Sequence, residues 1–191
     1  LGPGALVLAG VALSSLFTGG STLLQYFADD TKLGAVVFWT FGDLGGTNWG
    51  ELALLAAVTA ASFAYFMLRR WDYNALGAGS DTASSLGVNV RAVTLAGMAV
   101  CTAASALAVS FVGIISFIGL VAPHAMRRFV GDDYRWLLPC STAGGALLLL
   151  LADLVSRVLI APVILPVGAI TSFLGAPVFL YLLLKGGAAR A

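Results

Sequence analysis

The sequence predicts an all-α membrane protein, a polytopic bundle of about six transmembrane helices. Of its 191 residues, 60% are hydrophobic and only 10% are charged, and the mean hydropathy is +0.98. A soluble domain carries about 25% charged residues. The charges also fall in short segments between long apolar blocks. This placement is expected for lipid, because an Asp, Lys or Arg at the bilayer centre costs roughly 2.5–3.5 kcal/mol on insertion scales.

The apolar blocks predict the elements in order, since a bilayer span needs about 20 apolar residues. We expect single spans over 5–27, 52–68, 137–155 and 167–184. The block 92–126 has no formal charge if His124 is neutral, and it is too long for one span. It therefore predicts a helical hairpin that bends near 110–113. The segment 33–41 is too short to span and contains Trp39 and Phe41, so we expect it in the membrane interface.

Basic residues predict the orientation of the spans, because cytoplasmic loops carry an excess of Lys and Arg. With the polar loop 72–90 in the cytoplasm, only Lys32 and Arg157 of the ten basic residues lie outside. The other eight lie inside: Arg69, Arg70, Arg91, Arg127, Arg128, Arg135, Lys185 and Arg190. We therefore expect a multi-pass protein of the cytoplasmic (inner) membrane, in contact with lipid, with both termini inside. A net charge of +1 argues against a nucleic-acid partner.

The polar loop 72–90 predicts two short helices. Asp72 can cap the first, which Gly77 ends, and Ser80 or Asp81 can cap the second. The second helix runs to Leu86, and Gly87 ends it in a left-handed conformation. Local sequence leaves two interpretations open: an ordinary loop with capping residues, or a rigid element on which a cytoplasmic partner docks.

Six segments resemble one family in order and spacing. They are FWTFGDLGG at 38–46, LGAGSDTASSLGVNV at 76–90, GIISFIGLVAPH at 113–124, DDYRWLLP at 132–139, LADLVSR at 151–157 and LPVGAITSFLGAPVFLY at 165–181. The family is the FecCD-type permease subunit of ABC importers for iron-siderophores, haem and cobalamin. The resemblance covers nearly the whole chain. It implies a type II importer permease with ten spans, of which residues 1–191 form the C-terminal part.

The resemblance also implies function and partners. A ferric siderophore is the first expected cargo, with haem or cobalamin next, moved by alternating access. The expected partners are ABC ATPase subunits, a periplasmic or lipoprotein substrate-binding protein, and a second permease copy. Loop 72–90 would be the coupling loop on the ATPase, through Ser80, Asp81, Thr82, Ala83, Ser84, Ser85, Leu86 and Gly87. The family often has two Glu residues where Ser80 and Asp81 stand, and Arg where Ser84 stands, which puts its salt bridges to the ATPase in question.

Two residues near the outer surface have competing interpretations. Asp153 is the one acid deep in an apolar block, and Arg157 follows it by one helical turn on the same face. The pair can form a local ion pair. In the resembled family, a basic residue at this point pairs instead with a glutamate of the binding protein. Four glycines, Gly113, Gly119, Gly168 and Gly175, are candidates either for close helix packing or for lining the transport pathway.

The sequence offers little for catalysis or cofactor binding. It has no GxxxxGK[ST] phosphate loop, so ATP with its Mg²⁺ would be hydrolysed in a partner subunit. We expect no cofactor and no metal site, with His124 as a helix-end residue and Cys101 and Cys140 as small apolar residues. Two rival classes remain, an ion-coupled secondary transporter and a membrane enzyme. The transporter needs ionisable residues near the midplane, and Asp153 alone comes close. The enzyme needs two facing acids or a Ser-His pair inside the bilayer, and the sequence offers neither.

Overall fold

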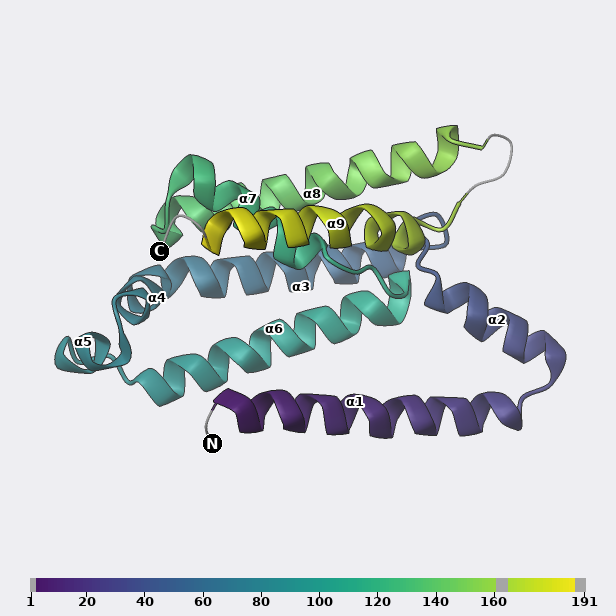
Figure 1. Ribbon diagram of the computed structural model, residues 1–191, viewed down its shortest axis with the longest axis horizontal. Coiled ribbons are helices and arrows are strands. Elements are labelled where there is room, and N and C mark those ends of the chain that lie inside the picture. The colour runs from purple at the N-terminus through teal and green to yellow at the C-terminus, as the bar shows by residue number, and fades with distance from the viewer. Residues whose placement is uncertain (1–2, 161–164, 188–191) are drawn as a thin grey trace. The chain divides into compact units, whose positions relative to one another are not determined.

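The computed structural model describes residues 3–160 and 165–187, and all regular structure in these ranges is α-helical (Figure 1). The chain divides into two compact units, residues 1–40 and 41–191. The first contains α1, Pro3–Tyr26, and α2, Asp30–Thr40. The second contains α3 (Trp49–Leu68), α4 (Arg70–Gly77), α5 (Ser80–Ser85), α6 (Val90–Val112), α7 (Ile118–Val130), α8 (Tyr134–Val158) and α9 (Val167–Gly187).

Four helices of the described part are long and apolar enough to cross a bilayer: Val7–Tyr26 of α1, and the whole of α3, α6 and α8. Helix α9 has 21 residues and a shorter apolar part, Val167–Tyr181. The 11 residues of α2 are too few to span, as predicted for this segment. These helices confirm an all-α membrane fold.

The predicted hairpin over 92–126 differs from the structure in its second limb. Helix α6 ends at Val112, and its C-cap residue Gly113 has φ 78°, which confirms a bend there. Residues 113–117 are then non-helical, and α7 has 13 residues. At about 1.5 Å per residue, α7 is roughly 20 Å long, against about 30 Å for the hydrocarbon core. The second limb of the predicted hairpin is therefore shorter than a full helical span. Hydropathy does not detect this break, because residues 114–117 are as apolar as the helix that follows.

The core of the second unit lies among α7, α8 and α9. Its buried apolar side chains include Val121 and Ala122 of α7, Leu137 of α8, and Val167 and Ile170 of α9. Most other large apolar side chains are exposed, such as Phe173 at 81% and Leu150 at 66%. Exposed apolar area costs about 25 cal/mol per Å² in water. The surface of this unit therefore requires lipid or other protein around it.

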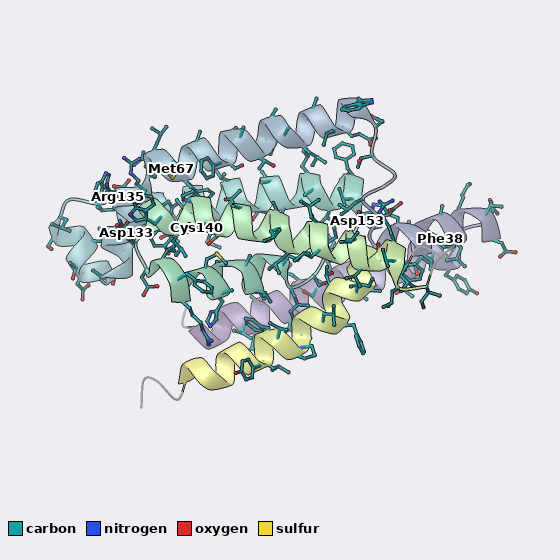
Figure 2. All side chains as sticks on the ribbon, turned by 90° about the horizontal axis from the view of Figure 1, so that it is seen from above. Phe38, Met67, Asp133, Arg135, Cys140 and Asp153 are labelled. Carbon is teal, nitrogen blue, oxygen red and sulfur yellow. The ribbon has the colours of Figure 1, made fainter. Side chains whose placement is uncertain are left out.

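The second unit has two distinct polar ends. Figure 1 shows α4 and α5 at the end where α3 finishes and α6 starts. Figure 2 places Asp133 and Arg135 at that same end, and Asp153 at the opposite one. The basic residues predict that the α4–α5 end faces the cytoplasm.

Cysteine labelling tests this orientation. Ser85 in α5 and Gly46 in the loop before α3, at the opposite end of the unit, are both exposed. With Cys101 and Cys140 replaced by Ala, a cysteine at Ser85 should react with a membrane-impermeant maleimide only in inside-out vesicles. A cysteine at Gly46 should react in intact cells. Labelling of the Ser85 variant in intact cells would show that the orientation is wrong.

Candidate functional site

Helices α4 and α5 form the candidate site, and α3 sets where α4 begins. Arg69 is both the C-cap of α3 and the N-cap of α4. Its side chain makes no capping hydrogen bond to α4. Asp72 lies inside the first turn of α4, where its carboxylate accepts a hydrogen bond of 2.9 Å from Arg69 Nη1. The prediction that Asp72 caps this helix is therefore wrong. The chain enters α4 already helical from α3, so no separate cap starts the helix.

The start of α5 also differs from the prediction. Its N-cap is Gly79, at φ 117°, with no side-chain capping bond, so Ser80 and Asp81 do not cap it and Ser80 opens the helix. The Ser84 hydroxyl donates back to the Ser80 carbonyl at 2.9 Å. Neither polar side chain is needed as a cap, because Gly79 makes the turn through a backbone conformation that side chains rarely adopt.

The end of α5 confirms the predicted left-handed glycine. Gly87 has φ 82°, and its N–H donates to the Ser84 carbonyl at 3.0 Å. The N–H of Val88 donates to the Ala83 carbonyl, also at 3.0 Å. This pair of bonds is the Schellman motif, which satisfies carbonyl groups that a helix end otherwise leaves free. The loop therefore ends α5 at a defined residue.

One buried residue fixes α5, and its other side chains face outward. Ala83 is fully buried, with 0% exposed. The exposed residues of the predicted coupling set are Ser80, Asp81, Thr82, Ser84, Ser85, Leu86 and Gly87. Leu86 is 68% exposed, so an apolar side chain stands among small polar ones. This surface is suited to contact with another protein, and it contains no nucleophile with an adjacent base.

Tyr73 fixes α4 on the bundle. Its ring lies 5.5 Å from that of Phe66 and 5.9 Å from that of Tyr134, centroid to centroid. Its hydroxyl lies 3.4 Å from the Val93 carbonyl of α6. Burial, and then a hydrogen bond with Tyr65, raise the pKa of Tyr73 to about 12, so the hydroxyl keeps its proton at neutral pH. Tyr73 thus contacts three of the helices that cross toward the other end.

At the opposite end, Arg157 and Asp153 form the predicted ion pair. Arg157 Nε donates to Asp153 Oδ2 at 2.8 Å, and Arg157 Nη2 donates to Oδ1 at 3.1 Å. The Arg157 side chain is 47% exposed and that of Asp153 is 21% exposed. The carbonyl of buried Ser156 accepts the N–H of Leu165 at 3.1 Å, which ties this end of α8 to the chain before α9. The bonds to Asp153 use Nε and Nη2 of Arg157, and the nearby Asp43 carboxylate also interacts electrostatically with the guanidinium.

The four candidate glycines occupy different environments. Gly113 is buried at the positive-φ end of α6, and Gly119 has no heavy atom within 4 Å of where its Cβ would stand. A Cβ at Gly168 would overlap the carbonyl oxygens of Phe41 and Ile114, and one at Gly175 would lie 2.6 Å from Phe117 Cβ. Gly168 and Gly175 are thus close-packing positions, whereas Gly119 faces open space.

This contrast gives a prediction for one pair of variants. Gly168→Ala forces a methyl group onto two backbone oxygens that cannot rotate away, and such overpacking costs roughly 1–3 kcal/mol. We expect about two- to threefold less folded protein in detergent, measured by size-exclusion chromatography, for a membrane protein of marginal stability. Gly119→Ala is the control and should match wild type. Equal yields for both variants would contradict the packing assignment of Gly168.

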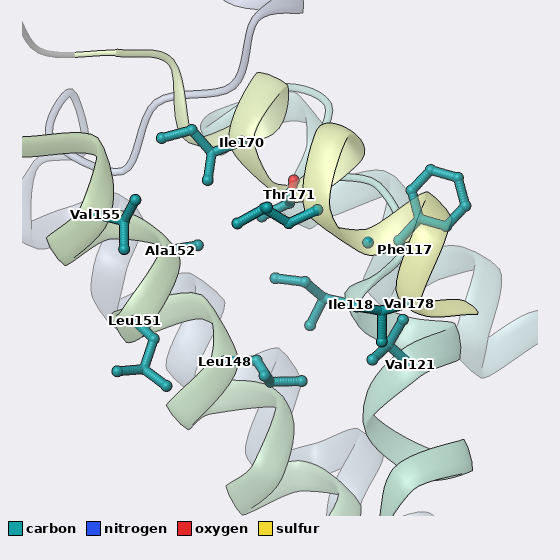
Figure 3. A pocket seen from close by; sticks show the side chains of 12 residues that line it. Phe117, Ile118, Val121, Leu148, Leu151, Ala152, Val155, Ile170, Thr171 and Val178 are labelled. Atoms are coloured by element: carbon teal, nitrogen blue, oxygen red, sulfur yellow. The ribbon is translucent and has the colours of Figure 1, made fainter. Parts of the chain in front are cut away.

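A cavity of about 200 Å³ lies between α7, α8 and α9 (Figure 3). Its wall is nearly all apolar, and it includes Phe117, Leu151, Val155 and Val178. The one hydroxyl in the wall belongs to Thr171 and donates to the Gly168 carbonyl at 3.0 Å. Such a wall offers a charged molecule no polar partner. In the described ranges no three His, Cys, Asp or Glu side chains gather as metal ligands.

Sequence reasoning missed two features of this region. Phe117 has φ 66°, the one positive φ of a non-glycine residue in the described ranges, and it begins α7. No local sequence pattern predicts the positive φ of Phe117. Asn74 bonds to residues at the start of α8, 59 and 60 positions along the chain. A contact over that separation leaves no periodic trace in one sequence.

Comparison with known proteins identifies relatives over almost the whole chain. The model of the FecCD transport family matches residues 1–185. An ABC transporter permease protein of Methanocaldococcus jannaschii is 58% identical over 97% of this chain and 53% of its own length. A hemin transport permease of Yersinia pestis is 40% identical, over 94% of this chain and 54% of its own. An iron(3+)-hydroxamate import permease of Bacillus subtilis is 41% identical, over 95% and 47%.

A solved structure agrees with these sequences. A metal-chelate type ABC transporter in an inward-facing conformation superposes with a TM-score of 0.87 at 32% identity, covering 94% of this chain and 58% of its own. The chain thus spans about half the length of the relatives that it matches.

Proposed function

The chain belongs to the FecCD transport family, and from that premise we propose that it acts in the permease subunit of an ABC importer for a metal chelate. The family match over residues 1–185 carries the proposal. The permease works by alternating access in the cytoplasmic membrane. A separate ABC ATPase supplies the energy. A second permease copy completes the pathway, and the exposed apolar surface of this unit fits such an assembly.

The α4–α5 segment is the proposed contact with the ATPase. Its exposed residues stand at the predicted cytoplasmic end, and its shape is fixed by Gly79, Gly87 and buried Ala83. Asp81 is the one charged residue of α5, and Ser84 is neutral. The contact therefore depends on shape, hydrogen bonds and Leu86 more than on ion pairs.

Arg157 is the proposed docking residue for the substrate-binding protein. Its bidentate pair with Asp153 holds the guanidinium in one orientation. Nη1 takes no part in this pair, so a carboxylate of the partner can bind there without breaking it. The two roles considered for Arg157 are then compatible, since different edges of the same group serve them.

A ferric siderophore is the first proposed cargo, with haem or cobalamin next. Relatives named for hemin, iron(3+)-hydroxamate and cobalamin support the class of bulky metal chelates. The rival of an ion-coupled transporter has less support, because it needs ionisable groups near the midplane. Asp153, the acid deepest in an apolar block, is already bonded to Arg157 near the end of α8.

Reconstitution tests the proposal. The permease that contains this chain is placed in liposomes with its ATPase and binding protein, and uptake of ferric hydroxamate, haemin and cobalamin is compared. We expect uptake of one of these chelates only when ATP is enclosed in the liposomes and the ATPase faces their interior. Uptake driven by a proton or sodium gradient without ATP would instead favour a secondary transporter.

A further inference from the structure

Asn74 of α4 takes part in the N-terminal cap of α8. Its Nδ2 donates to Asp133 Oδ1 at 2.9 Å, and its Oδ1 accepts the N–H of Tyr134 at 2.8 Å. Tyr134 is the first residue of α8, whose opening N–H groups have no partner within the helix. One amide side chain therefore satisfies a donor and an acceptor of another helix at the same time.

Asp133, the N-cap residue of α8, completes the same cap. Its Oδ1 accepts the N–H of Arg135 at 2.9 Å as well as the bond from Asn74. These two bonds, the backbone one first, hold the pKa of Asp133 below its ordinary value of 3.8. A lowered pKa means that the carboxylate accepts both bonds at neutral pH, and that the cap weakens only as the pH falls through that lowered pKa.

Two further contacts flank the Asn74 bonds. The Arg135 guanidinium carbon lies 5.1 Å from the ring centroid of Trp71, and the rings of Tyr73 and Tyr134 are 5.9 Å apart. Residues 71, 73 and 74 of α4 thus meet residues 133–135. Helix α4 cannot move away from the start of α8 without breaking hydrogen bonds, a ring contact and a cation–π contact together.

Helix α8 extends from this cap toward the other polar end of the unit. It has 25 residues, packs on α7 and α9, and contributes Leu148, Leu151 and Val155 to the apolar cavity. Arg157 lies in its last turn. Pro139 removes one backbone hydrogen bond near the start of α8, but the helix continues past it to Val158, so we expect a displacement of its first turn to be carried along the helix. Movement of α4 therefore reaches both the cavity wall and the proposed docking residue.

We propose that Asn74 is a positioning residue that makes α8 move with the α4–α5 segment, so that ATPase motion is converted into rearrangement of the cavity wall. This inference rests on the proposed function. The competing view is that Asn74 only stabilises the fold. The two views differ in one readout, the amount of chelate transported per ATP hydrolysed.

Exchanging the amide and the carboxylate between positions 74 and 133 distinguishes the two views of Asn74. Asn74→Asp removes the amide donor and sets a carboxylate against that of Asp133. Asp133→Asn keeps an oxygen that can accept from both Asn74 and the Arg135 N–H. In the double variant the amide at position 133 donates to the carboxylate at position 74, so the pair is restored with donor and acceptor exchanged. The variants are made in the permease that contains this chain, assembled in liposomes with its ATPase and binding protein.

We expect Asn74→Asp to lower uptake of radiolabelled ferric hydroxamate by about tenfold, since like charges at hydrogen-bonding distance repel. ATP hydrolysis should fall much less than uptake, because the exposed face of α5 is unchanged, so the amount of chelate transported per ATP hydrolysed should fall. Asp133→Asn should have a small effect, and the double variant should regain most of the uptake.

Three outcomes would overturn the inference: uptake by Asn74→Asp at the wild-type ratio to ATP hydrolysis, loss of uptake and ATP hydrolysis in equal proportion, or no recovery in the double variant. A wild-type complex that shows no ATP-driven uptake of ferric hydroxamate, haemin or cobalamin would overturn the proposed function itself. That result is distinguishable, because it occurs without any substitution.

Discussion

Gly87→Val is expected to lower ATP-driven uptake by about tenfold, with a parallel loss of ATPase association. Gly87 has φ 82°, and a side chain in the left-handed region costs roughly 1–2 kcal/mol, more for a β-branched residue. Nothing lies within 4 Å of its Cβ position, so the cost is conformational and does not come from crowding. The strain would open the two bonds that end α5, from the N–H groups of Gly87 and Val88.

The matched control is Gly77→Val at the end of α4. Gly77 also has open space around its Cβ position, and its φ is not positive. We expect near wild-type association for this control, and normal membrane insertion for both variants, because both residues lie outside the candidate spans. Co-purification of the ATPase and vesicle uptake measure the effects. Wild-type behaviour of Gly87→Val would mean that α5 is an ordinary loop.

Arg157→Glu is expected to weaken docking of the binding protein by at least about tenfold, since it sets an acid against the partner's carboxylate and such like-charge juxtaposition costs several kcal/mol. The substitution removes the proposed cation. It also sets two acidic side chains one helical turn apart, where Arg157 Nε now bonds Asp153 at 2.8 Å. ATPase association should remain, because α4 and α5 lie at the end of the second unit opposite Asp153 (Figures 1 and 2).

Lys32→Glu provides the control for charge alone. Lys32 is the other basic residue predicted on the outer side, and its ion pair with Asp29 spans 3.4 Å between side chains that are 75% and 79% exposed. Such exposed pairs contribute little, roughly 0–1 kcal/mol. Binding of the loaded binding protein to vesicles should be nearly unchanged for Lys32→Glu. Equal loss in both variants would indicate general electrostatic attraction and would contradict a specific role for Arg157.

The spans could be predicted because lipid imposes a strong local rule on sequence. Apolar blocks between charged residues located α1, α3, α6 and α8 within a few residues. Gly87 could be predicted for a similar reason, since its conformation depends on the neighbouring turn. The break before α7 could not be predicted. Residues 113–117 are non-helical, with a positive φ at Gly113 and Phe117, but their hydropathy does not differ from that of the helices on either side.

The two short helices of the candidate site were predicted, but the residues that fix their positions were not. The exposed surface of α5 followed from the motif at 76–90, but the assigned caps were wrong, because α3 and Gly79 already determine where α4 and α5 begin. The link from Asn74 to Asp133 joins residues 59 positions apart. A single amide bonded to a distant helix cap has no periodicity, so only the three-dimensional structure shows it.

Site-specific photocrosslinking tests the central claim most directly, namely that α5 is where the ATPase binds. A photoreactive residue at Ser84, which is exposed on α5, is compared with one at Gly46, exposed in the opposite loop. In the assembled importer, Ser84 should give an ATPase adduct that disappears in the Gly87→Val background, and Gly46 should give none. Absence of the Ser84 adduct from a complex that still takes up chelate with ATP would contradict the account.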